Sequence, residues 1–267
     1  MGTKMDIKKN NGFTILETTL VLAISSLLLI LMLTGITLAV QQQRFSDSVN
    51  GSQSFIQQQF NYTQNTTNDR PLGACDATNP GAPSADAQDV RGSSDCLIIG
   101  KLLELKASAG DDESHIIAYD VIGADVDVES DLYRGLSDLE LINSIKPTVI
   151  EPNKTDYPVP WGAHLSNIKD SDSVSTGSDV RYVALLRSPR SGVIHIYKIS
   201  SPLAVQELAL PQSLTASIQE IDTSVKMCLS SIDLVNYGAM LEIMPSGSQD
   251  GVVAHFDDGS QEAYGCV

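Results

Sequence analysis

A single carboxylate lies inside a long apolar stretch near the start of the chain. The 28 residues from Phe13 to Val40 contain only one charged side chain, Glu17. As a helix they would extend about 42 Å at roughly 1.5 Å per residue, enough to cross a hydrocarbon core of about 30 Å. A carboxylate in such a segment costs about 2.5 to 3.5 kcal/mol. The sequence therefore predicts a membrane-spanning helix whose acid needs a cationic partner.

A cationic partner would arise if the chain were cut between Gly12 and Phe13. The new terminal amine of Phe13 would then lie about one helical turn from Glu17. Between two staggered copies, the amine of one could neutralise the carboxylate of the next and fix their axial offset. The residues before the cut form a short leader with three lysines and one acid: Lys4, Lys8, Lys9 and Asp6.

These features resemble the type IV pilin family, which includes pilins and pseudopilins. The matching residues are Gly12 at the end of a basic leader, Phe13 as the first mature residue and Glu17 as the fifth. The resemblance implies that a prepilin peptidase cuts after Gly12 and methylates the amine of Phe13. It also implies that Glu17 contacts other pilin subunits during assembly. The motif covers about the first fifth of the chain.

Two simpler interpretations fit the apolar run less well. A secretory signal peptide has an apolar region of about 7 to 15 residues followed by small residues at a cleavage site, and this run is far longer. An ordinary single-helix anchor explains the length but not the position of Glu17 beside the Gly12–Phe13 pair.

Charge predicts the orientation and limits the partners. Lysines precede the apolar run and only Arg44 follows it closely, so we expect the leader in the cytoplasm and the remainder outside. The resemblance to type IV pilins then implies a single-pass membrane protein before assembly and a part of an extracellular pilus afterwards. The net charge of −16 disfavours general affinity for nucleic acid and anionic lipid.

Four cysteines follow the apolar run, and none has the C-x-x-C spacing of a zinc site. Because an exported head is in an oxidising compartment, we expect two disulfides. Three connectivities are open, and sequence order favours Cys75–Cys96 with Cys228–Cys266.

A local concentration of positive charge contrasts with the acidic chain. No acid occurs between Val180 and Gln206, and the same stretch carries four cations: Arg181, Arg187, Arg190 and Lys198. These residues could contact DNA, an acidic neighbouring subunit or a surface ligand. The alternative is that they compensate acids on their own domain.

Other polar clusters give weaker indications. Four acids alternate with apolar or small residues: Asp125, Asp127, Glu129 and Asp131. Such oxygens could bind calcium, but the stretch lacks the glycine and distal glutamate of an EF-hand. We interpret it as a strand with one solvated acidic face, and we expect no metal.

No catalytic set stands out. The sequence has no H-E-x-x-H, G-x-S-x-G or Walker-type motif, and its four histidines are isolated: His115, His164, His195 and His255. We interpret the protein as a non-enzyme without a cofactor. The only tryptophan, Trp161, lies among prolines, and we expect it to be buried and to pin a loop.

The predicted elements place these residues on a long helix and a β-rich head. Phe45, Val49, Ile56 and Phe60 recur at helical spacing, so the helix should continue from Phe13 to Gln64 with one side packed on the head. The region from Cys75 to Asp95 reads as a loop. Leu132 to Ile145 is predicted to be a short helix.

Strand predictions follow from β-rich runs between turn residues. They cover the stretch beginning at Cys96, Ser114–Ile122, Tyr237–Met244, Val252–Phe256 and Gln261–Cys266, with Pro147–Pro160 extended. Arg181–Leu186 and Val193–Ile199 should form a hairpin, whereas Leu214–Cys228 is ambiguous between helix and strand.

The fold class is α+β, a long N-terminal helix packed on a mainly antiparallel sheet. The expected divisions are 1–12 leader, 13–40 transmembrane helix, 41–68 amphipathic continuation and 69–267 head. The last 45 or so residues, from Cys228 onward, resemble loosely the head of GspH/FimT-type minor pilins, although Asp125–Asp179 is not part of that pattern. The alternatives to a minor pilin are a pseudopilin of a secretion system or a tip pilin that binds DNA or a surface ligand.

Overall fold

The computed structural model divides the chain into two compact units, Met1–Arg44 and Phe45–Val267. The residues that it describes are 14–65, 74–76, 79–84, 96–106, 113–170, 182–199, 210, 212–215, 217–221, 224–231, 238–245 and 251–256. We call the second unit the head.

The helix α1 (Ile15–Gln64) begins where Thr14 caps it. The backbone N–H of Glu17 donates to the Thr14 hydroxyl at 3.3 Å, and the N–H of Thr18 donates to the Thr14 carbonyl at 3.1 Å. Such caps satisfy donors that the first helical turn leaves open. Residues 15–40 are all exposed and overwhelmingly apolar, and this is the one helix among the described residues that is long and apolar enough to cross a membrane.

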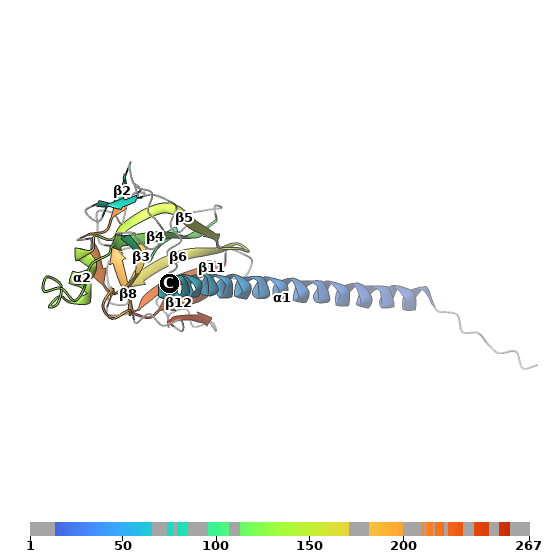
Figure 1. The fold of residues 1–267 in the computed structure, drawn as a ribbon. Helices are drawn as coiled ribbons and strands as arrows, with labels where there is room; N and C mark the ends of the chain where they lie inside the picture. The colour runs from blue at the N-terminus through green and yellow to red at the C-terminus, as the bar shows by residue number, and fades with distance from the viewer. Residues whose placement is uncertain are drawn as a thin grey trace, which may run out of the picture. The chain divides into compact units, whose positions relative to one another are not determined.

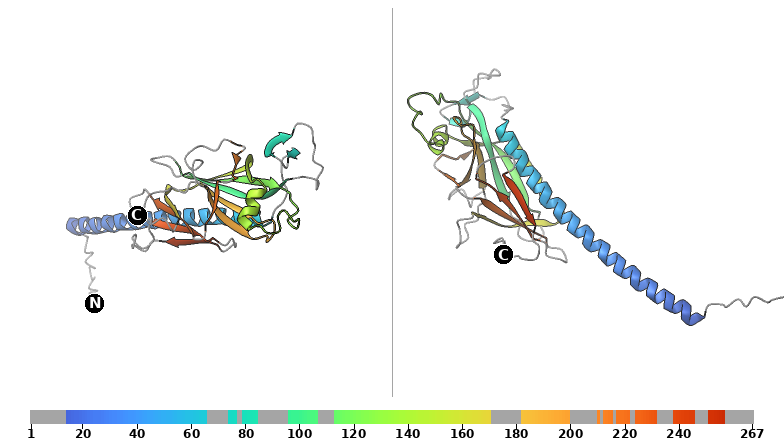
Figure 2. Two further views of the ribbon diagram at one scale, coloured as in Figure 1. Left: turned by 90° about the vertical axis from the view of Figure 1, so that its left-hand side faces the viewer. Right: turned by 90° about the horizontal axis from the view of Figure 1, so that it is seen from below.

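Within the head, α1 buries the apolar stripe that the helical spacing of its residues from Phe45 to Phe60 predicted. Val49, Ile56 and Phe60 are at most 1% exposed, and Phe45 and Phe55 are also buried. Both views of Figure 2 show this helical part alongside the strands of the head. Two glutamines beside the stripe also hydrogen-bond to the head. The side-chain amides of Gln53 and Gln57 both donate to the carbonyl of Val252 in β13 (Val252–Phe256).

The head contains two larger antiparallel sheets (Figure 1). The seven-stranded sheet has the order β10-β8-β7-β3-β4-β5-β9. Its strands are β3 (Cys96–Lys106), β4 (His115–Ala124), β5 (Thr148–Pro158), β7 (Tyr182–Arg187), β8 (Ile194–Ile199), β9 (Gln212–Ser213) and β10 (Ile218–Glu220). The four-stranded sheet has the order β13-β12-β11-β6. It adds β6 (Ala163–Asp170), β11 (Val225–Ser231) and β12 (Gly238–Ile243). The α+β class is thus confirmed.

Two apolar cores lie on opposite faces of the seven-stranded sheet. One gathers the α1 stripe, residues such as Leu103 and Leu185, and the inner face of the four-stranded sheet. The other gathers Leu102, Tyr197 and the short helix α2 (Asp138–Ser144). Because alternate side chains of a strand point to opposite faces, a strand buried on both sides is apolar along most of its length.

A β-bulge changes the alternation in β3. The pairing of β3 with β4 shifts between Ile98 and Gly100, so Ile99 joins the α2 core together with Leu102. Gly100 is required there, since a Cβ atom at this position would collide with the backbone carbonyl of Leu185 in β7. The absence of a side chain at Gly100 therefore lets the backbones of β3 and β7 approach closely.

Most element predictions are confirmed, and several are wrong. The hairpin formed by β7 and β8 and the strands β3, β4, β5, β12 and β13 are where we expected them. The acidic stretch from Asp125 to Asp131 is a loop that runs into turns, not a strand, and α2 starts only after Ser137. The expected loop at Cys75–Asp95 contains a small hairpin of β1 (Ala74–Asp76) and β2 (Asn79–Ser84). The ambiguous stretch contains β10 and β11, and Gln261–Cys266 lies outside the described residues.

Two of the cysteines are placed by the structure. Cys96 and Cys228 are each disulfide-bonded, and both are buried. Their predicted bonds to Cys75 and Cys266 stay predictions, because the side chain of Cys75 and all of Cys266 lie outside the described part of the chain.

Candidate functional site

The start of α1 carries the first candidate site. Gly12 and Phe13 lie outside the described residues. Glu17 occupies the first turn, and its side chain is exposed. Its backbone is held by the Thr14 cap, so the carboxylate sits at the positive end of the helix dipole, where an acid is favoured. An exposed acid at the mouth of an apolar helix can accept a hydrogen bond from an incoming cation.

A second candidate site is a pocket of about 490 Å³ in the head. It is formed where the strands β3, β4 and β7 end together. Its lining comes from the start of β3, the end of β4 with the loop that follows, and the β7–β8 turn: Leu97, Ile98, Ile99, Ala124, Asp125, Val126, Val128, Arg187, Ser188, Pro189, Arg190, Ser191 and Gly192. The lining thus combines aliphatic side chains with two arginines and one aspartate.

The pocket exists because β3 is longer than its neighbour β7. Pairing between the two runs from Gly100 with Leu186 to Glu104 with Tyr182. Beyond Gly100, β7 continues only to Arg187 and the chain turns toward β8. The residues Leu97–Ile99 therefore pass the point where β7 leaves the sheet.

Both arginines of the pocket are held by backbone carbonyls. Arg190 donates from its two terminal nitrogens to the carbonyls of Leu136, at 2.7 Å, and Tyr133. Arg187 donates from Nε to the carbonyl of Gly192 at 3.3 Å and from Nη1 to the carbonyl of Gln64 at 3.4 Å. These contacts orient both guanidinium groups before any ligand arrives.

Hydrogen bonds also fix the β7–β8 turn. The Ser188 hydroxyl accepts from the backbone N–H groups of Arg190 and Ser191, at 3.3 and 3.2 Å. Gly192 has a φ of 71°, in the left-handed region that favours glycine. The Ser191 hydroxyl donates to the Asp138 carboxylate at 3.1 Å, which links the turn to α2.

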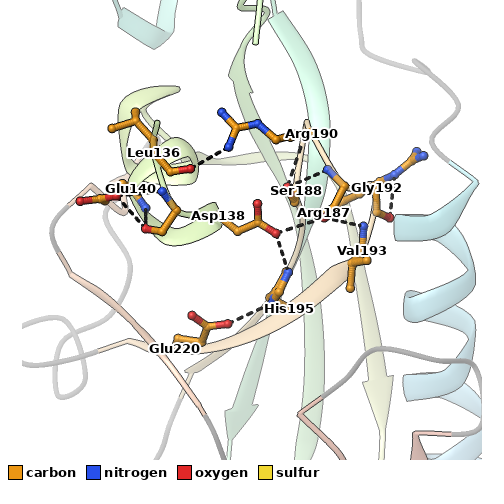
Figure 3. Close-up of polar contacts among 12 residues, drawn as sticks. Leu136, Asp138, Glu140, Arg187, Ser188, Arg190, Gly192, Val193, His195 and Glu220 are labelled. Carbon is orange, nitrogen blue, oxygen red and sulfur yellow. Dashed lines mark hydrogen bonds and ion pairs between the residues drawn. The ribbon is translucent and has the colours of Figure 1, made fainter. Parts of the chain in front are cut away.

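Beside this turn, His195 lies between two carboxylates (Figure 3). Its Nε2 is 3.0 Å from Oδ2 of Asp138, and its Nδ1 is 2.9 Å from Oε1 of Glu220. Carboxylates only accept, so both contacts are hydrogen bonds when the ring carries both protons. The three side chains thereby join the N-terminal end of α2, the strand β8 and the edge strand β10.

The environment of Asp138 favours its charged form. Burial alone would raise the pKa of Asp138, but hydrogen bonds from Ser188 and Ser191 and the neighbouring His195 lower it below its ordinary value. The same end of α2 has a capping box, in which Ser137 and Glu140 bond to each other's backbone N–H. The backbone and side-chain hydrogen bonds from Ser137 likewise lower the pKa of Glu140.

The geometry of the His195 cluster differs from that of a nucleophilic triad. In a triad one ring nitrogen faces a hydroxyl or thiol, and a carboxylate orients the other. Here both ring nitrogens face carboxylates. Among the described residues, no group of three or more histidine, cysteine, aspartate or glutamate side chains is arranged to hold a metal ion.

The structure brings together only part of the predicted basic surface. Arg187 and Arg190 both line the pocket, whereas Lys198 lies in β8 opposite Val183 and is not part of the lining. Arg181 lies outside the described residues. Of the acidic stretch, Asp125 belongs to the pocket.

Two more histidines have carboxylate partners, and the tryptophan differs from expectation. His115 is 2.8 Å from Asp156 and His255 is 3.3 Å from Glu242, so carboxylates from neighbouring strands accompany these two as they do His195. The prediction that Trp161 is buried was wrong. It is 56% exposed on the turn between β5 and β6, and its φ of 64° is unusual for a bulky residue.

Sequence reasoning missed the residues that complete the pocket and the cluster. Asp138 and Glu220 come from segments 57 and 25 residues away from His195, so no local spacing connects them. The capping box at Ser137 and Glu140 was readable as S-x-x-E and marks the start of α2.

Comparison with known proteins gives no further guide: no family model, no curated protein and no solved structure matches this chain.

Proposed function

We propose that this protein is a structural subunit, a minor pilin, of a type IV pilus or a related filament. A prepilin peptidase cuts after Gly12 and methylates the amine of Phe13. The helix up to Val40 anchors the subunit in the membrane and then packs against other subunits in the filament core, with the head outside the cytoplasm.

The observation that carries this proposal is the exposure of the apolar half of α1. From Ile15 to Val40 every residue is exposed in the single chain, although most of them are apolar. Exposed apolar surface on this scale has a large hydrophobic cost in water, which lipid or other helices would remove. A subunit that moves from membrane to filament exchanges one apolar environment for another.

Glu17 gives the assembly step its specificity. Lipid alone would favour an uncharged residue at this position. In the filament, the carboxylate of one subunit meets the terminal amine of Phe13 in its neighbour, and this pairing sets the axial offset. The same carboxylate is compatible with membrane insertion because it lies in the first turn of α1, near the interface.

The first test is mass spectrometry of the native N-terminus, which should find a chain that starts at a methylated Phe13. The second is Glu17→Ala in the host strain. This variant should be processed at normal levels but should be absent from sheared filaments. Thr18→Ala, next in the chain and also exposed, is the matched control and should assemble normally. A protein that retains residues 1–12, or filaments that form normally with Glu17→Ala, would contradict the proposal.

A pseudopilin of a secretion system shares all these residues and is the second candidate. The two differ in what the filament does, so deletion of the protein separates them. Loss of surface pili supports the pilin role, whereas loss of a secreted enzyme with pili intact supports the pseudopilin role.

A further inference from the structure

We propose that the pocket between β3 and the β7–β8 turn binds an extended acidic peptide segment, which adds to the edge of β3 as a short strand. This inference does not depend on the filament role. It rests on a strand edge, a pair of oriented arginines and an apolar wall that converge at one place in the head.

The strand edge comes from the difference in length between β3 and β7. Pairing with β7 stops at Gly100, and on that side no other described strand pairs with Leu97–Ile99. Strand addition uses this kind of edge, because its backbone N–H and C=O groups can pair with an incoming chain. The β-bulge at Ile98–Gly100 and the β7–β8 turn limit the open edge of β3 to a few residues.

The charge of the pocket favours an acidic segment. Among the described residues of the lining, two are arginines, Arg187 and Arg190, and one is an acid, Asp125, so the described lining is net positive in a chain of net charge −16. The two carbonyl contacts of Arg190 use two of the five N–H donors of its guanidinium. Neutral carbonyls leave the positive charge of Arg190 in place, and the orientation that they impose reduces the entropy lost when a carboxylate binds.

The aliphatic lining accepts the alternate side chains of such a strand. Leu97 is 42% exposed, and Val126 and Val128 are partly exposed beside it. A volume of about 490 Å³ lies within the usual range for ligand pockets. A segment that alternates valine with glutamate would place apolar side chains against this lining and carboxylates toward the arginines.

The same geometry argues against DNA as the occupant. Affinity for DNA comes from several cations along a phosphate backbone. Here Lys198 is not in the pocket, and the two arginines lie close together in the chain, Arg187 at the end of β7 and Arg190 in the turn that follows. The site is a compact pocket instead of a positively charged track.

The test measures fluorescence anisotropy of a labelled peptide, acetyl-Val-Glu-Val-Glu-Val-amide, with the full chain in detergent micelles. Its neutral counterpart, with glutamine in place of glutamate, should bind at least about tenfold more weakly, because hydrogen bonds to charged groups are the stronger ones. Arg190→Gln should weaken binding of the acidic peptide by a similar factor. Arg134→Gln is the matched control, since Arg134 is an exposed arginine outside the lining and should leave binding unchanged.

Arg190 also holds the backbone before α2, so a second variant tests the pocket without it. Leu97→Glu adds a negative charge at an exposed position of the lining and should abolish binding of the acidic peptide. The far-ultraviolet circular dichroism spectra of all variants should match the wild type. Equal binding of both peptides, unchanged binding in Leu97→Glu, no binding at all, or displacement of the peptide by a short DNA duplex would each overturn the proposal.

Discussion

Asp138 is the residue that joins the β7–β8 turn, α2 and His195. It accepts hydrogen bonds from Ser191 and from His195, and its pKa is lowered relative to the ordinary value of 3.8 although burial opposes the shift. A carboxyl with a depressed folded pKa contributes stability above its unfolded pKa, and this contribution is lost as the pH falls through the folded value. The charged Asp138 carboxylate should therefore stabilise the head at neutral pH, and this stabilisation should be lost in acid.

We predict that Asp138→Asn lowers the free energy of unfolding by about 1 to 3 kcal/mol at pH 7, because hydrogen bonds to a charged group are lost. The difference from wild type should shrink as the pH falls below about 3.8, where the unfolded carboxyl takes up a proton, and should disappear once the pH is below the lower pKa of the folded carboxyl. Urea unfolding at pH 7 and pH 3 measures both values. Asp131→Asn, at a 95% exposed side chain, is the control and should change stability by less than about 0.5 kcal/mol. An equal loss at both pH values would contradict the assignment.

At the scale of single residues, the sequence was a partial guide. Arg187 and Arg190 were named among four possible ligand contacts of one basic stretch, and both line one pocket. His195 was classed as isolated, because its carboxylate partners arrive from α2 and β10. Exposure of Trp161 could not be read from its proline-rich neighbours, since it depends on how the β5–β6 turn projects.

Among the elements, β3 depends most on one glycine. A Cβ atom at Gly100 would collide with the Leu185 carbonyl, which is backbone and cannot swing aside. Gly100→Ala should therefore separate β3 from β7 locally and destabilise the head by more than about 2 kcal/mol. Gly135→Ala is the matched control, because a Cβ atom there meets open space. Thermal unfolding followed by circular dichroism compares the two, and equal melting temperatures would show that the bulge can relax.

Element predictions succeeded where the pattern was local. The β7–β8 hairpin was readable because its turn residues and its β-rich flanks lie within one short segment. The stretch Asp125–Asp131 alternates acids with apolar residues as a strand would, yet it forms turns that lead toward α2. Alternation alone does not provide a pairing partner, and the sheet already places β5 beside β4.

At the scale of the whole molecule, the apolar half of α1 predicts association with a membrane. We predict that the full chain fractionates with membranes and resists extraction by carbonate. The double substitution Leu28→Lys with Leu29→Lys should release it, because each charge in a membrane helix costs about 2.5 to 3.5 kcal/mol. The control is a single change in the opposite direction in the head, Lys226→Leu, which should not alter fractionation. A wild-type chain that carbonate extracts would exclude a spanning helix.

The class of the fold was predictable, but its sheet order was not. A long helix and many short strands indicate α+β with antiparallel pairing. The pairing of β6 with β11, however, joins segments about 60 residues apart, as Ala163 opposite Ser231 illustrates. Such non-local contacts arise from packing on the shared core, which no window of sequence contains.

The exposed turn between β5 and β6 has one practical consequence. Trp161 is the only tryptophan in the chain, and it lies more than half in solvent at a fixed point of the head. The tryptophan emission of the protein therefore reports on that single turn, and its wavelength depends on whether water, lipid or another protein surrounds the indole ring.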